Sequence, residues 1–156
     1  MASTVPTSSG TAAPGTGLPG VLARRRPTGV AFVATAAGLT LLSPLPGRVQ
    51  VWAGAWCVLL AAVIYLTWGT ARGELADRRR LTAQTAGVLA FGAIAVTAAG
   101  VDPDAARYVL AAGWTAHAAW DAVHHRLDRV VPRWYAETCL VADLLIATAL
   151  LTVGLA

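Results

Sequence analysis

Residues 51–70 read VWAGAWCVLLAAVIYLTWGT, a run without a single charged side chain. A helix of about 20 apolar residues is long enough to cross a hydrocarbon core of roughly 30 Å. The run is too long for a barrel strand and lacks the two-residue alternation of one, so it predicts a transmembrane helix. The charged stretch that follows, RGELADRRR at 72–80, ends this helix at an aqueous surface.

The rest of the chain repeats this alternation of apolar runs and short arginine-bearing breaks. Hydrophobic residues make up 56% of the 156 residues and charged residues only 13%, whereas soluble domains carry about 25% charged residues. The composition therefore argues against a water-soluble domain. We predict an all-α fold, an integral membrane bundle of five transmembrane helices at about 28–46, 51–70, 81–101, 106–125 and 134–155.

The N-terminal segment, residues 1–27, is rich in Ser, Thr, Pro, Gly and Ala. Such a segment offers too little apolar surface to offset the entropy of ordering it, so we expect a disordered cytoplasmic tail before the membrane domain at 28–156. Arg24, Arg25 and Arg26 followed by an apolar run resemble the start of a signal peptide. No small-x-small cleavage site follows, however, so an uncleaved first helix is the preferred interpretation.

Arginine sets the expected orientation of the bundle, because cytoplasmic loops collect positive charge. Ten of the 12 basic residues flank the N-terminus or lie in the breaks after the second and fourth helices, whereas Arg48 and Arg107 lie on the other side. The N-terminus is therefore predicted inside, in the plasma membrane, with the lipid bilayer as partner. The positive charge of the chain is explained by its membrane topology, so no nucleic-acid partner is expected. Arginine without lysine is also typical of a high-GC bacterium such as an actinomycete.

Cys57 and Cys139 are the two cysteines of the chain. Cys57 lies near the outer end of the second predicted helix and Cys139 near the inner end of the fifth. Their depths differ by roughly 10 Å at about 1.5 Å of rise per residue, which is beyond disulfide reach. Both are expected to be free thiols.

Ionisable side chains gather in the last two predicted helices. The stretch 114–125 reads WTAHAAWDAVHH and holds all three histidines. At about 100° per residue, Asp121 lies about 40° from His117, and His124 lies about 20° on the other side. The fifth helix presents Cys139 and Asp143 at i, i+4 spacing. Because the connecting loop is short, both sets are expected to face each other in the inner half of the membrane.

Three interpretations of this cluster stay open. Placing a carboxylate deep in a bilayer costs about 2.5 to 3.5 kcal/mol unless it is paired. Such a residue is therefore first interpreted as functional. His117, Asp121 and Asp143 can form a metal-free acid/base site, with Asp121 orienting His117 and Asp143 donating a proton. Alternatively, His117, Asp121 and His124, with Cys139 as a further candidate, can bind a transition metal such as Zn, Fe or Cu. In the third interpretation the side chains only pair structurally.

Neighbouring residues offer support for a pocket. Trp114 and Trp120 flank the His/Asp face and are expected to wall an apolar ligand or simply to pack. Tyr65 and Gln84 lie at similar depth, where each can form a helix–helix hydrogen bond. Glu137 projects on another face of the fifth helix.

The favoured function is a membrane-embedded enzyme that acts on a lipophilic small molecule from the cytoplasmic leaflet. The alternatives are a non-catalytic subunit that binds another membrane protein, or a proton- or metal-handling transporter component. Transport needs polar residues at successive depths, and the outer halves of these helices contain almost no polar side chains. This distribution favours a pocket on one side of the membrane.

The last third of the chain also carries a resemblance. His117, Asp121, His124 and His125 follow the pattern HxxxDxxHH, and residues 132–143 follow PxWYxxxCxxxD. The two patterns together resemble a small family of uncharacterised bacterial multi-pass membrane proteins. The resemblance implies a multi-pass membrane fold and no established activity.

Overall fold

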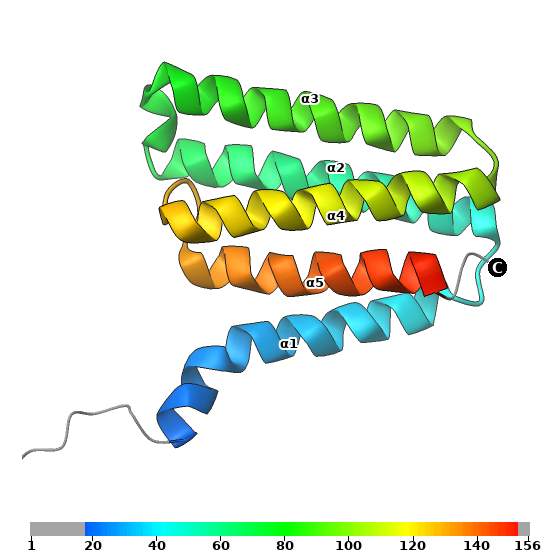
Figure 1. Cartoon of the computed structure of the whole chain (residues 1–156), viewed down its shortest axis with the longest axis horizontal. Helices are drawn as coiled ribbons and strands as arrows, with labels where there is room; N and C mark the ends of the chain where they lie inside the picture. Colours follow the sequence, from blue (N-terminus) through cyan, green and yellow to red (C-terminus); the bar gives the residue numbers. More distant parts are fainter. Residues whose placement is uncertain (1–17, 153–156) are drawn as a thin grey trace, which may run out of the picture.

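Five α-helices and one short 3-10 helix make up residues 18–152, the part of the chain that the computed structural model describes (Figure 1). No strand occurs in that range, so the all-α prediction is confirmed. The elements are α1 (Leu18–Leu42), α2 (Gly47–Ala71), η1 (Glu74–Ala76), α3 (Arg78–Gly100), α4 (Pro103–Leu127) and α5 (Arg133–Thr152).

Two of the helices, α3 and α4, begin at an aspartate that caps them. The Asp77 carboxylate accepts a hydrogen bond from the backbone N–H of Arg79, and that of Asp102 accepts one from Ala105. Such bonds satisfy N–H groups that have no partner within the helix. Asp128 ends α4 in the left-handed conformation. These caps lie within a few residues of the predicted ends of the third and fourth helices.

The first helix differs from its predicted range of 28–46. It begins at Leu18, includes Pro27, and ends at Leu42. Leu, Ala and Arg, which favour helices, precede Pro27, so the helix continues on both sides of it. At the other end Pro44 cannot donate a backbone hydrogen bond, and the helix stops before it. Of the predicted disordered tail, residues 1–17 lie outside the described residues, as do residues 153–156 at the end of the fifth helix.

The fourth helix occupies the centre of the bundle. α4 packs against α2, α3 and α5, α2 packs against α3, and α1 packs on α5. Consecutive helices run antiparallel (Figure 1). The main core is built where α2, α3, α4 and α5 meet, from residues such as Val51, Val58, Phe91 and Leu110.

Glycines allow two helices to approach closely. A Cβ atom on Gly113 would lie 2.7 Å from Cγ2 of Ile94, and one on Gly87 would lie 3.1 Å from Cζ2 of Trp120. Both contacts join α3 to α4. Small residues thus let the backbones of this helix pair pack closely.

Three of the helices, α2, α3 and α5, are long and apolar enough to cross a membrane. The apolar part of α1, Arg26–Leu42, is shorter, and α4 is not in this group. Helix α4 is less apolar because it contains polar residues, which include His117, Asp121 and His124. The structure thus supports membrane association through three helices. Cys57 and Cys139 are both free, as predicted.

The two ends of the bundle differ in charge. The start of α1, the η1 turn and the α4–α5 turn lie at one end, and the α1–α2 and α3–α4 turns lie at the other (Figure 1). The arginine-rich breaks therefore share an end. At the opposite end, the guanidinium of Arg48 donates to the carbonyl oxygens of Ala99 at 3.2 Å and Val101 at 2.9 Å. Arg48 thereby satisfies carbonyls at the C-terminus of α3.

Candidate functional site

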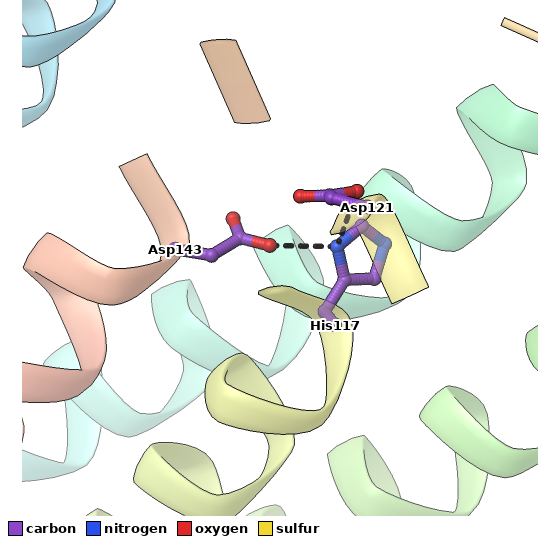
Figure 2. A group of neighbouring side chains, drawn as sticks. All are labelled: His117, Asp121 and Asp143. Carbon is purple, nitrogen blue, oxygen red and sulfur yellow. Dashed lines mark hydrogen bonds and ion pairs between the residues drawn. The ribbon is translucent and has the colours of Figure 1, made fainter. Parts of the chain in front are cut away.

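Three ionisable side chains meet in the interior of the bundle, His117 and Asp121 from α4 and Asp143 from α5 (Figure 2). Their exposed fractions are 0%, 0% and 3%. One ligand atom from each residue lies within 4.8 Å of the other two. We call these residues the triad. The i, i+4 spacing on α4 stacks Asp121 next to His117, as the sequence predicted.

Both carboxylates face the same imidazole nitrogen. His117 Nδ1 lies 2.7 Å from Asp143 Oδ2 and 3.5 Å from Asp121 Oδ1 (Figure 2). The shorter distance is that of a charge-assisted hydrogen bond. Nδ1 is therefore the atom around which the triad converges.

Tyr65 joins the triad from α2. Its hydroxyl donates a hydrogen bond of 2.5 Å to Asp121 Oδ1, and its side chain is 1% exposed. The site is thus built from three helices. Sequence reasoning gave Tyr65 only a generic helix–helix role, and its depth in α2 was the one signal that pointed to it.

Aromatic rings enclose the imidazole. The centroid of the His117 ring lies 4.8 Å from that of Phe91, 5.6 Å from that of Tyr65 and 6.4 Å from that of Trp114, each in an edge-on arrangement. The Trp114 ring therefore packs against the imidazole of the site. Trp120 instead contacts His124, with centroids 4.9 Å apart. Phe91 was not singled out from the sequence, because one Phe in an apolar helix carries no signal.

Some buried polar atoms at the site have no hydrogen-bond partner in the described part of the chain. They are Nε2 of His117, Oδ2 of Asp121 and, one turn away, Nε1 of Trp114. A buried polar atom without a partner costs about 1 to 3 kcal/mol. The triad therefore retains capacity to bind a further atom or ion.

His124 lies outside the triad, although it shares a helix face with it. Its Nδ1 lies 2.9 Å from the carbonyl oxygen of Trp120 and its Nε2 lies 2.9 Å from Nε2 of Gln84. The carbonyl can only accept, so Nδ1 carries the proton and Nε2 accepts from the Gln84 amide. Both nitrogens are thus occupied in a neutral imidazole.

Cys139 is half-buried on α5, one turn before Asp143. It does not belong to the group of ligand atoms formed by the triad, and neither does His124. Of the four ligands predicted for a metal, the structure brings together His117 and Asp121 and adds Asp143, which the sequence assigned to catalysis.

The α4–α5 turn fixes how the two helices face each other. Asp128 and Val130 both have positive φ, at 51° and 69°, in a connection that spans 128–132. Val130 and Val131 are buried against Tyr65 and Ala136. A β-branched residue seldom adopts this conformation, so the packing of the turn must hold it there. The turn thereby sets the register between Asp121 and Asp143.

The fold and the site together define an all-α bundle with three potential membrane-crossing helices and a buried His/Asp/Asp triad. No protein-family model, no curated protein and no solved structure matches this chain.

Proposed function

We propose that the chain is a five-span membrane protein, N-terminus cytoplasmic, whose triad binds a divalent transition metal ion of the zinc or iron class. The convergence of one imidazole nitrogen and two carboxylates within 4.8 Å, deep in the bundle, carries the proposal. Imidazole and carboxylate are both common ligands of these ions.

The side chains that α4 exposes support its role as a membrane span. Between residues 108 and 123 the exposed positions are Tyr, Ala, Thr and Val, none of them charged. The ionisable groups of that stretch, His117 and Asp121, are buried. A helix that is polar inside and apolar outside suits a bilayer when its neighbours cover the polar face. The shared end of the arginine-rich breaks supports the cytoplasmic N-terminus.

Charge balance favours a divalent cation at the triad. Ionised Asp121 and Asp143 bring two negative charges into an apolar interior. A protonated His117 would neutralise only one of them, whereas a divalent ion bound to neutral His117 neutralises both. An uncompensated charge in such an interior costs several kcal/mol.

The distances are compatible with metal binding. Ligand atoms around a tetrahedral ion with bonds of 2.0–2.2 Å lie about 3.4 Å apart. The distance from His117 Nδ1 to Asp121 Oδ1 is 3.5 Å, close to this value, and the distance to Asp143 Oδ2 is 2.7 Å. The Asp143 side chain would move by roughly 0.7 Å, which a side-chain rotation supplies. The hydroxyl of Tyr65 lies beside the same site and orients Asp121.

The chemistry of such a site is Lewis-acid activation of a polar group on a lipophilic substrate. A bound metal ion would polarise a carbonyl or an oxygen nucleophile. The aromatic rings around His117 would exclude water from the reaction.

Metal analysis of the purified protein tests the proposal. We expect about one metal ion per chain in protein extracted with a mild detergent, measured by inductively coupled plasma mass spectrometry. His117→Gln and Asp143→Asn remove a ligand each and should reduce the metal content to background. Absence of metal, even after incubation with Zn²⁺ or anaerobic Fe²⁺, would contradict the proposal.

Matched variants control for nonspecific binding. His125→Ala removes a half-buried imidazole beyond the triad, and Asp104→Asn removes an exposed carboxylate at the start of α4. Both should retain the metal content of the wild type. Gel filtration of each variant shows whether it is folded.

The 2.7 Å hydrogen bond between His117 and Asp143 favours a second candidate, a metal-free acid/base pair. In that form Asp121 and Asp143 would hold a protonated His117, which can donate to a substrate through Nε2. The metal analysis separates the candidates, because this form leaves the wild type without metal.

A further inference from the structure

Two arginine-bearing segments meet at one end of the bundle (Figure 1). They are 72–80, which contains η1, and 126–133, which contains the α4–α5 turn. A Cβ atom on Gly69 of α2 would lie 2.9 Å from Cδ2 of Leu75 and 3.1 Å from Cγ1 of Val130. Leu75 belongs to the first segment and Val130 to the second, so both segments pack against the same point of α2. Their arginines therefore form one surface, which we call the arginine patch.

The acidic side chains of the two segments are paired with two of the arginines. Arg80 pairs with Glu74 and, at 3.6 Å, with Asp77. The guanidinium of Arg133 lies 3.4 Å from an oxygen of Asp128. The remaining arginines are exposed and have no ion pair in the described part of the chain: Arg72, Arg78, Arg79, Arg126 and Arg129. The patch therefore carries positive charge that these segments do not compensate.

Two of the unpaired arginines also lie where positive charge is unfavourable. Arg78 and Arg79 belong to the first turn of α3. The N-terminal end of a helix carries the positive end of its dipole, so cations there destabilise the helix. An anion close to these two guanidinium groups would offset that cost.

Apolar side chains border the patch and indicate where the anion comes from. Leu127 is 59% exposed and Trp134 is 51% exposed. In the sequence Leu127 follows Arg126, and Trp134 follows Arg133. Trp is enriched where lipid headgroups meet the hydrocarbon. A lipid offers negative charge and apolar surface together, whereas a nucleic acid backbone offers only the charge.

We propose that the arginine patch binds the headgroup of an anionic phospholipid, with guanidinium groups from both segments pairing with its negative charge. Guanidinium groups match phosphate oxygens in geometry and in charge. Clusters of about four to eight basic residues beside a transmembrane helix are typical binding sites for anionic lipids. The inference rests on the membrane embedding in the proposed function and not on the metal. A lipid bound there would link the connection between α2 and α3 to the α4–α5 turn.

Native mass spectrometry of the full chain in detergent measures the binding. The probes are dioleoyl phosphatidylglycerol and dioleoyl phosphatidylcholine, which have the same acyl chains but differ in the net charge of the headgroup. We expect phosphatidylglycerol to bind roughly fivefold more tightly or better, because one arginine near an anionic surface contributes that factor.

Paired substitutions locate the lipid. Arg79→Gln/Arg129→Gln removes one guanidinium from each segment and should weaken binding of phosphatidylglycerol about fivefold or more. Arg79→Lys/Arg129→Lys retains the charge and should keep most of the preference. Arg48→Gln/Arg107→Gln removes the same charge from the opposite end and should leave the preference unchanged. Arg107→Gln alone is the control if that double variant does not fold.

Equal binding of the two lipids by the wild type, or a preference that survives Arg79→Gln/Arg129→Gln, would overturn the inference. So would a single-stranded RNA oligonucleotide that binds more tightly than phosphatidylglycerol through the same arginines. Carbonate extraction from phosphatidylcholine liposomes separates this failure from that of membrane embedding. A chain that stays in the liposomes but shows no lipid preference contradicts the arginine patch alone, whereas a chain that carbonate removes contradicts both proposals.

Discussion

Tyr65 connects α2 to the triad through its hydroxyl group. It is buried, and it donates to Asp121 Oδ1 from a different helix. The other oxygen of Asp121 has no partner in the described part of the chain. The carboxylate therefore depends on Tyr65 and on the neighbouring His117 for its stabilisation.

Replacing Tyr65 by Phe should lower the free energy of unfolding by about 1 to 3 kcal/mol, because a buried carboxylate oxygen loses its donor. Thermal or denaturant unfolding in detergent measures the change. Tyr108→Phe is the matched control, since the Tyr108 hydroxyl is exposed and bonds only Arg107 among the hydrogen bonds described. A Tyr65→Phe variant as stable as the Tyr108→Phe variant would show that the bond contributes little.

Helical spacing was sufficient to predict that His117, Asp121 and Asp143 gather, because the residues on α4 share a face and the turn to α5 is short. It could not predict the partners of His124. The imidazole lies on the same face, but the register between α3 and α4 gives it Gln84. That register arises from packing between helices distant in sequence, which a single sequence does not reveal. For the same reason, the sequence did not predict the contact between Tyr65 and Asp121.

At the scale of the elements, α3 and α4 come into close contact at Gly113. The nearest atom to a Cβ on Gly113 would be Ile94 Cγ2 at 2.7 Å, whereas a Cβ on Gly38 of α1 would meet nothing within 4 Å. The same substitution therefore has opposite consequences on two helices.

Gly113→Ala should destabilise the bundle by about 1 to 3 kcal/mol, because Ile94 or the helices must move apart. Gly38→Ala should be neutral or stabilise by up to about 1 kcal/mol through helix propensity. Unfolding of both variants in the same detergent provides the comparison. Equal stability of the two would mean that Ile94 changes rotamer without cost.

The helix ends show where local sequence is informative. Asp77 and Asp102 mark the starts of α3 and α4 through bonds to nearby backbone, and these starts were predicted within a few residues. The start of α1 was not, because residues 1–27 were assigned to a disordered tail on their composition. Proline usually limits a helix, but the residues on both sides of it favour helix here. Of the five predicted spans, α2, α3 and α5 are long and apolar enough to cross a membrane.

At the scale of the whole molecule, the proposed topology makes α4 the decisive helix. Reporter fusions after Val101 and after Arg129 lie on either side of it. We expect an extracytoplasmic signal at the first and a cytoplasmic signal at the second, because α4 crosses the membrane in the proposed five-span arrangement. A fusion after Arg80 should report the cytoplasm. Identical signals after Val101 and Arg129 would contradict a crossing by α4.

The burial of the α4 polar face also constrains how the protein is made. Alone in a bilayer, Asp121 would cost about 2.5 to 3.5 kcal/mol at mid-depth. The α5 partner that closes the triad, Asp143, is synthesised later, only a short turn further along the chain. In a five-span protein, α4 would therefore remain poorly retained by lipid until α5 emerges from the ribosome. The last two helices would then partition into the membrane as one hairpin, with their polar side chains already facing each other.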